Sequence, residues 1–335
     1  MGVKLAIIGY GYWGKNLVRN FNNLENCTVK YVCEREEKSA KKCSNLYPGI
    51  KVVSEYEEVL SDPEIDAVVI ATSINTHYDL SKKALENDKH VLVEKPMTDS
   101  FEKAKELKRM ADKLSKVLMV DHTFLYTGAV SYLKKKIDEG EYGQINYIDS
   151  TRVNLGLFQQ DLNVLWDLAP HDISICFYLM NALPLTVQAT GISHTENNIE
   201  NIAYLTLKYD NDTIVHFNCS WVSPVKIRQM LIGGSKKMVV FNDMEPTEKI
   251  KIYDTGFRVR SDQEKDEFTA DYRVGDIFVP KVGTTEALSA MAQDFIAAIV
   301  EGKEPDSNAD IGMQVVRILD AAEKSLKNNG QEIAL

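Results

Sequence analysis

The first 121 residues alternate short apolar runs with amphipathic stretches. The runs are rich in Val, Ile and Leu and cover residues 4–9, 28–34, 66–71, 90–94 and 117–121. Runs of this length are typical of parallel strands that are covered on both faces. Between them we predict helices at residues 15–23, 38–46, 79–87 and 101–114. This alternation predicts an α/β domain with a doubly wound parallel sheet.

From residue 122 onward the pattern predicts an α+β domain. Two turn signals, Asn211-Asp212 and Gly233-Gly234-Ser235, separate strand-like segments as hairpin loops do. We therefore expect an open, mostly antiparallel sheet with helices on one face. The predicted strands are residues 144–154, 202–209, 213–221, 226–232, 236–241 and 249–253, and the predicted helices are 130–139, 170–180, 286–300 and 311–328. Residues 254–283 are polar and are predicted to form a long loop or an oligomer contact.

Composition narrows the class of protein. A chain of 335 residues with 44% hydrophobic residues fits two packed domains, which we place at 1–121 and 122–335. The net charge of -10 disfavours nucleic acid and anionic lipid as partners. No apolar run is long enough to span a membrane, and the first strand begins too early for a secretory signal, so we expect a cytoplasmic protein. The five cysteines lack a C-x-x-C pair, so we expect neither disulfides nor a metal site.

A glycine motif follows the first predicted strand. Gly9, Gly11 and Gly14 form the sequence GYGYWG, which also contains Tyr12 and Trp13, directly before a predicted helix. In this context the first glycine allows a tight turn, the second lets a pyrophosphate approach the backbone, and the third allows close packing of helix on strand. The helix N-terminus would then face the diphosphate. The motif predicts a dinucleotide site with Tyr12 and Trp13 as further cofactor neighbours, although a tight turn alone would also use these glycines.

Polar residues at other strand ends extend this site. Glu34 ends the second strand about 20 residues after Gly14, where a carboxylate can bind both ribose hydroxyls and would repel a 2′-phosphate. We therefore predict NAD rather than NADP, although the neighbouring Arg35 could pair with a 2′-phosphate if Glu34 turned away. Three residues follow the next strand and are predicted ribose or nicotinamide neighbours: Thr72, Asn75 and His77. For His77, loop packing is an equally good interpretation.

Two further segments suggest chemistry on a substrate oxygen. Lys95, in the sequence Glu94-Lys95-Pro96, follows the fourth predicted strand and could stabilise a developing alkoxide. Asp167 and His171 flank Pro170, which favours a helix start, so we expect a helix to begin near Pro170 with His171 in its first turn. A helix N-terminus disfavours a protonated histidine, which suits His171 to accept a proton. A surface lysine, an N-terminal cap and a packed ring remain the structural alternatives.

With these motifs in place, the whole chain resembles the glucose-fructose oxidoreductase and inositol dehydrogenase family, often called Gfo/Idh/MocA. The resemblance implies a Rossmann domain for NAD, which Glu94 and Lys95 border, and a catalytic trio of Lys95, Asp167 and His171. The residues Asn163-Val164-Leu165-Trp166 stand where the family has a glycine-rich run, so the sugar pocket should differ, with Trp166 beside the substrate. Residues 122–130 and 166–172 look most like members that act on nucleotide-linked sugars, such as UDP-N-acetylglucosaminuronate 3-dehydrogenases.

The resemblance implies that His171, assisted by Asp167, takes a proton from a sugar hydroxyl while hydride passes to the nicotinamide and Lys95 stabilises the alkoxide. Candidate donors for a sugar-linked diphosphate are Arg152, Lys226 and Arg228. The alternatives are a free sugar or inositol dehydrogenase, a redox-assisted glycosidase, a non-catalytic NAD-binding sensor, and an enzyme of non-sugar ketones or dihydrodiols. Because one face of a broad sheet needs covering, we also expect a homodimer or homotetramer formed through the second sheet.

Overall fold

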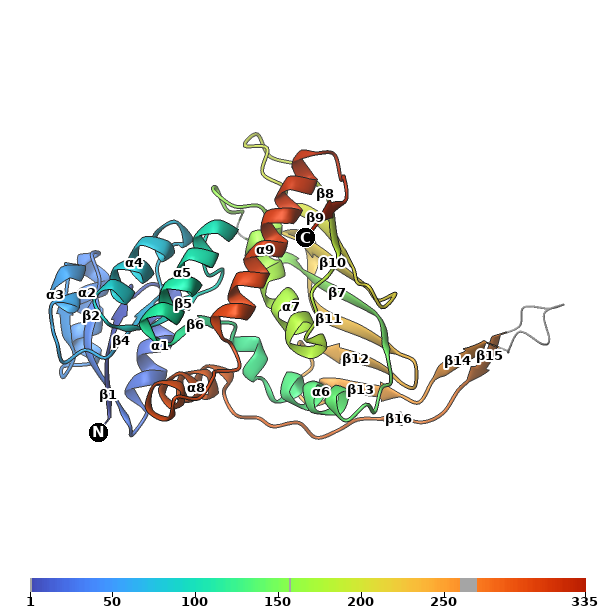
Figure 1. The fold of residues 1–335 in the computed structure, drawn as a ribbon, viewed down its shortest axis with the longest axis horizontal. Helices are drawn as coiled ribbons and strands as arrows, with labels where there is room; N and C mark the ends of the chain where they lie inside the picture. The colour runs from blue at the N-terminus through green and yellow to red at the C-terminus, as the bar shows by residue number, and fades with distance from the viewer. Residues whose placement is uncertain (1, 157, 260–269) are drawn as a thin grey trace. The chain divides into compact units, whose positions relative to one another are not determined.

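A computed structural model describes residues 2–156, 158–259 and 270–335. The chain divides into two compact units, which we describe separately (Figure 1). The first unit contains Met1–Thr127 and Thr285–Arg317, and the second contains Gly128–Thr284 and Ile318–Leu335. No helix among the described residues has the length and apolar character needed to cross a membrane.

The first unit contains the predicted parallel sheet. Its six strands have the order β3-β2-β1-β4-β5-β6, and every neighbouring pair is parallel. The strands are β1 (Val3–Ile8), β2 (Cys27–Cys33), β3 (Lys51–Val53), β4 (Ala67–Ile70), β5 (His90–Glu94) and β6 (Leu118–Asp121). The helices are α1 (Tyr12–Asn22), α2 (Glu37–Leu46), α3 (Tyr56–Leu60), α4 (Ile74–Glu86) and α5 (Phe101–Leu114), followed by the short 3-10 helix η1 (Thr123–Tyr126). Strand β3 and helix α3 were not predicted, because segments this short do not show a periodic pattern of hydrophobic residues.

The first unit also includes a helix from the far end of the chain, which differs from the predicted boundary at residue 121. Helix α8 (Ala287–Glu301) buries Met291 and Phe295 in the same core cluster as Phe21 of α1. The rings of Phe21 and Phe295 meet edge to face, with centroids 6.2 Å apart. The sequence of α8 has an apolar stripe that predicts a buried face, but it does not say which sheet that face covers. The stripe consists of Leu288, Met291, Phe295, Ile296 and Ile299.

The second unit contains a nine-stranded sheet in the order β16-β13-β12-β11-β7-β10-β9-β8-β17. All neighbouring pairs are antiparallel except β7 and β10, so the predicted mostly antiparallel sheet is confirmed. The strands are β7 (Ile145–Leu155), β8 (Thr186–Ile192), β9 (Ile202–Lys208), β10 (Ile214–Ser220), β11 (Val222–Gly234), β12 (Met238–Asn242), β13 (Ile250–Tyr253), β16 (Ile277–Phe278) and β17 (Ile333–Ala334). Helices α6 (Gly128–Asp138) and α7 (Val164–Met180) precede and follow β7, and α9 (Ala309–Lys327) runs from the first unit into the second.

Part of the predicted loop at 254–283 is a hairpin. Strands β14 (Gly256–Val259) and β15 (Ala270–Arg273) pair antiparallel, and β16 joins the large sheet through β13. Residues 260–269 of that predicted loop lie outside the described residues. The prediction of an oligomer contact there stays a prediction.

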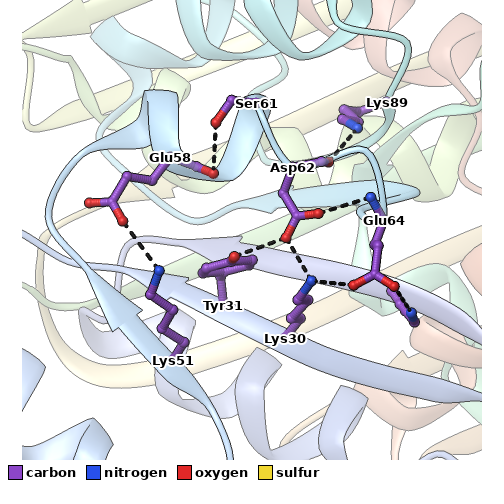
Figure 2. Close-up of polar contacts among 9 residues, drawn as sticks. Lys30, Tyr31, Lys51, Glu58, Ser61, Asp62, Glu64 and Lys89 are labelled. Carbon is purple, nitrogen blue, oxygen red and sulfur yellow. Dashed lines mark hydrogen bonds and ion pairs between the residues drawn. The ribbon is translucent and has the colours of Figure 1, made fainter.

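A network of hydrogen bonds and ion pairs connects β2 to the loop that leads into β4 (Figure 2). The Asp62 carboxylate accepts from Lys30 Nζ at 2.6 Å and from the Tyr31 hydroxyl at 2.9 Å. Lys30 also donates to Glu64 at 2.6 Å, and Lys89 donates to the Asp62 carbonyl oxygen at 3.0 Å. Lys30 and its neighbours hold the pKa of Asp62 down at about 2. Because open parallel sheets bind ligands at the carboxyl ends of their strands, this network before β4 is best explained as structural.

Candidate active site

The glycine loop between β1 and α1 is shaped by two steric constraints. Gly9 has φ of +95°, and a Cβ there would lie 2.5 Å from the carbonyl oxygen of Ala71. A Cβ on Gly14 would lie 2.1 Å from the carbonyl oxygen of Gly9. Gly11 is different, because a Cβ there would meet no atom within 4 Å. Gly9 and Gly14 are therefore required by the fold itself, whereas the open space at Gly11 fits the close approach of a bound pyrophosphate.

Helix α1 begins directly after Gly11, which is its N-terminal cap residue. Its first two residues, Tyr12 and Trp13, are 79% and 42% exposed, and their rings meet edge to face at 5.4 Å. The first turn carries no acidic side chain, so no carboxylate there competes with an anion for the helix N-terminus. The predicted role of the exposed aromatic pair as cofactor neighbours stays a prediction.

Glu34 lies directly after β2 and is held by the backbone on both oxygens. Oε2 accepts from the Tyr10 amide at 2.7 Å, and Oε1 accepts from the Glu36 amide at 2.8 Å. Turning this carboxylate away would break both hydrogen bonds. Each oxygen keeps a second lone pair, so the carboxylate can also accept from ribose hydroxyls.

A cavity of about 490 Å³ opens beside Glu34. It is lined by five residues that the sequence predicted, Gly9, Gly11, Glu34, Arg35 and Thr72, and by Ile8, Cys33, Tyr56, Ala71, Ser73, Thr76 and Leu80. The sequence analysis missed the second group, although Ser73 and Thr76 stand beside the predicted Thr72 at the end of β4. Thr72 and Thr76 share a hydrogen bond of 2.7 Å between their hydroxyl groups.

His77, a predicted cofactor neighbour, is not among the cavity-lining residues, and neither is Asn75. The His77 ring is 1% exposed and lies between two carbonyl oxygens, with Nδ1 2.9 Å from Pro96 O and Nε2 3.1 Å from Thr72 O. Burial lowers the pKa of His77, so the neutral ring donates to one of these carbonyls. The ring thus ties the segment after β4 to the segment after β5, in agreement with the loop-packing interpretation.

Lys95 follows β5 at the carboxyl edge of the parallel sheet, and the Lys95-Pro96 peptide bond is cis. The residue before it, Glu94, pairs in register with Asp121 at the end of β6. Both acidic side chains are buried, at 8% and 3% exposure. The Lys95 amide donates to Glu94 Oε2 at 3.3 Å, and the Thr123 hydroxyl donates to Asp121. Lys95 therefore lies next to an acidic pair that the sequence analysis missed.

Helix α7 begins at Val164 and not near Pro170, which corrects the predicted start. The Asn163 side chain caps the helix by accepting from the amides of Leu165 and Trp166 at 3.1 and 3.3 Å. Pro170 lies inside the helix, which tolerates the missing N–H at one position. His171 is consequently two turns from the N-terminus, and the argument that the helix end keeps its ring neutral no longer applies.

Asp167 and His171 are four residues apart on α7 and so project from the same side of the helix. Asp167 Oδ2 accepts from Trp221 Nε1 at 2.9 Å, which fixes one edge of the carboxylate. Trp166 is buried, at 5% exposure. Lys95 belongs to the first unit whereas Asp167 and His171 belong to the second, so the catalytic trio stays a prediction.

Arg152, a predicted substrate donor on β7, is buried in an ion pair. Its guanidinium donates to Asp172 of α7 through two hydrogen bonds of 2.9 and 2.6 Å, and both side chains are 6% exposed. Arg228 on β11 lies 3.6 Å from Asp243, and Lys226 is exposed. The pair with Asp172 gives Arg152 a structural role, which residue type alone could not indicate.

Known proteins match the chain along most of its length. Residues 3–122 match the family model described as an oxidoreductase family with an NAD-binding Rossmann fold, and residues 130–240 match the GFO/IDH/MocA C-terminal domain. A scyllo-inositol 2-dehydrogenase (NADP(+)) of Bacillus subtilis is 26% identical, with 97% of this chain and 94% of that protein covered. A UDP-N-acetylglucosamine 3-dehydrogenase of Acidithiobacillus ferrooxidans is also 26% identical, with 69% of this chain and 71% of that protein covered.

Solved structures agree on the fold. The crystal form P21 of the UDP-N-acetylglucosamine 3-dehydrogenase from Acidithiobacillus ferrooxidans matches with a TM-score of 0.81 and 21% identity, covering 99% of this chain and 100% of that chain. At this identity the match supports the fold and leaves the substrate open.

Proposed function

The chain belongs to the GFO/IDH/MocA oxidoreductase family, and on that premise we propose that it is an NAD-dependent dehydrogenase that acts at C3 of a nucleotide-linked sugar. The family fixes the coarser statement, an NAD-binding oxidoreductase that acts on CH–OH groups of sugar-like substrates. The observation that carries the dehydrogenase part of the proposal is Lys95 at the carboxyl end of β5, in the same unit as the glycine loop. The choice of C3 of a nucleotide-linked sugar is supported by the UDP-N-acetylglucosamine 3-dehydrogenase relative.

The choice of NAD over NADP rests on Glu34. Both of its oxygens accept backbone N–H groups, so the carboxylate has a fixed position at the cavity. A 2′-phosphate entering there would meet a negative charge that cannot turn away without losing two hydrogen bonds. Arg35 lines the same cavity, but it does not remove that charge.

In the proposed reaction NAD, when bound, accepts the hydride. His171 takes the hydroxyl proton, and Asp167, held by Trp221, assists it from the preceding turn of α7. Lys95 stabilises the negative charge that develops on the substrate oxygen. Lys226, exposed on β11, and Arg228 on the same strand remain the candidate donors for a sugar-linked diphosphate.

A second candidate function is dehydrogenation of free inositol or a related polyol. It is favoured by the inositol dehydrogenase relative, which covers 97% of this chain, whereas the nucleotide-sugar dehydrogenase relative covers 69%. Formation of NADH from saturating NAD, or of NADPH from saturating NADP, with free sugars, inositols and UDP- or dTDP-linked sugars separates the two functions. Turnover with inositol alone would replace the nucleotide-sugar proposal by this one.

Gly11→Ala tests the cofactor loop without disturbing the fold. Gly11 has φ of -70° and a Cβ there meets no atom, so the thermal midpoint should stay within about 2 °C of wild type. The same methyl group would obstruct the pyrophosphate, so we expect the Kd for NAD to rise by about ten-fold or more. Gly14→Ala is the matched variant and should lower the midpoint, because its Cβ meets the Gly9 carbonyl. Unchanged NAD affinity in Gly11→Ala would contradict the proposed pyrophosphate position.

The outer face of the second sheet supports the proposed homodimer or homotetramer. Side chains on it include Tyr204 and Ile214, each 45% exposed, and the Tyr204 ring stacks on His216. A second copy of the chain would cover these rings. Native mass spectrometry should therefore give a dimeric or tetrameric mass, and a monomer at micromolar concentration would contradict the proposal.

A further inference from the structure

Two buried carboxyl groups face each other at the carboxyl edge of the parallel sheet. Strands β5 and β6 are parallel neighbours, and Glu94 is in register with Asp121 at their ends. Residues in register on neighbouring strands point to the same side of a sheet, so the two side chains meet. They lie within hydrogen-bonding reach of each other, at 8% and 3% exposure.

The hydrogen-bond pattern of the described residues leaves one buried oxygen of each carboxyl group without a donor. Glu94 Oε2 accepts from the Lys95 amide, and Asp121 Oδ1 accepts from the Thr123 hydroxyl. Among the described residues, Glu94 Oε1 and Asp121 Oδ2 are buried and have no donor. Two carboxylates can only accept, so they cannot satisfy these two oxygens. A single proton between the groups would turn the contact into an O–H···O hydrogen bond and satisfy both.

The charges around the two carboxyl groups also favour one proton between them. Lys95 is the cation that acts on both carboxyl groups. His122, the residue after Asp121, is fully buried, and burial lowers its pKa to about 3, so its ring adds no positive charge at neutral pH. Burial raises the pKa of Glu94 and of Asp121, and Asp121 raises that of Glu94 further. The single positive charge of Lys95 is balanced when one of the two buried carboxyl groups is protonated and the other carries a negative charge.

From this geometry we infer that Glu94 and Asp121 share one proton and form a positioning pair that keeps a single negative charge beside Lys95. The charge and the hydrogen bond to the Lys95 amide hold the lysine segment in place at the sheet edge. The assignment of a positioning role rests on the proposed function of Lys95. The shared proton itself does not depend on any substrate.

Glu94→Gln tests the shared proton through stability. The glutamine amide can donate to Asp121 and keeps the charge of the pair at one negative. In wild type, the unfolded chain loses the Glu94 proton above its ordinary pKa while the folded chain keeps it, so stability falls as pH rises. The unfolding equilibrium constant of wild type relative to Glu94→Gln should therefore rise by about ten-fold per pH unit above about pH 5. Glu86→Gln, at an exposed carboxyl group on α4, is the control and should show no such trend. A ratio that stays flat, or that rises toward acid pH, would overturn the inference.

Infrared difference spectroscopy between wild type and the variants gives a second measurement. A protonated carboxyl group should absorb above the amide I band at neutral pH and shift in D2O, and Glu94→Gln or Asp121→Asn should remove the band. Absence of that band in wild type at neutral pH would overturn the shared proton.

Turnover separates the positioning role from the shared proton. Glu94→Gln and Asp121→Asn each keep one negative charge, so the kcat of these two single variants is the reference for the double variant. The double variant keeps the hydrogen bond but carries no charge, and its kcat should fall by about ten-fold or more, with unchanged Kd for NAD. A double variant as active as the singles would remove the positioning role. If Lys95→Met were fully active, the proposed function of Lys95 would fail while the stability and infrared results still decided the shared proton.

Discussion

Lys95→Met is expected to lower kcat by about 10²- to 10³-fold while the Kd for NAD stays near its wild-type value. The methionine side chain has similar length and flexibility but no positive charge to stabilise a substrate oxygen. The glycine loop and the Glu34 cavity are formed by other residues of the unit, so cofactor binding should survive. Steady-state kinetics and NAD titration on the same preparation check both parts.

The matched control is Lys105→Met, because Lys105 is an exposed lysine on α5 of the same unit. That variant should retain wild-type kcat and NAD affinity. Full activity in Lys95→Met would remove the lysine from the chemistry, and an equal loss in both variants would point to a general effect of removing surface charge.

Asp172→Ala is expected to destabilise the protein by about 3–5 kcal/mol. The change leaves the buried Arg152 guanidinium without the carboxylate that accepts its two hydrogen bonds. Desolvation of a charge that has lost its partner is the cause, so Arg152→Met combined with Asp172→Leu should restore most of the lost stability. Denaturant unfolding of the full chain measures the stability of both variants and of wild type.

An exposed pair that also involves β7, between Asp149 and His216, is the control for the buried ion pair of Arg152 and Asp172. Asp149 lies 3.4 Å from His216, with side chains 49% and 40% exposed, so Asp149→Ala should change stability by less than about 1 kcal/mol. An equally small effect for Asp172→Ala would contradict a structural role for the buried pair and return Arg152 to the candidate substrate donors.

Periodicity and glycine chemistry predicted the part of the fold that carries the cofactor. The continuous apolar runs identify β1, β2, β4, β5 and β6 because both faces of a parallel sheet are covered, and the glycine spacing has a steric reason at Gly9 and Gly14. The start of α7 was missed because Pro170 favours a first turn, while Asn163 in fact caps the helix seven residues earlier. A proline that is typical of a first helical turn can therefore lead to a wrong helix start when a side chain caps the helix further upstream.

Long-range packing accounts for the other differences. The stripe on α8 predicts a buried face, yet only the contact between Phe21 and Phe295 shows that the helix completes the first unit. Arg152 has the residue type of a phosphate ligand, and its pairing with Asp172 depends on how α7 lies on β7. Likewise, Glu94 and Asp121 are 27 residues apart, and only the register of β5 with β6 brings them together.

Hydride removal from C3 of a nucleotide-linked sugar can be followed by isotope transfer to the cofactor. Wild-type protein would be incubated with NAD and UDP-N-acetylglucosamine, or its uronate, carrying deuterium at C3, and the NADH formed would be analysed by mass spectrometry. The NADH formed should carry the deuterium, and it should be unlabelled when the label is at C2 or C4. Unlabelled NADH from the C3-deuterated sugar, or NADH formed from inositols and not from any nucleotide sugar, would contradict hydride removal from C3.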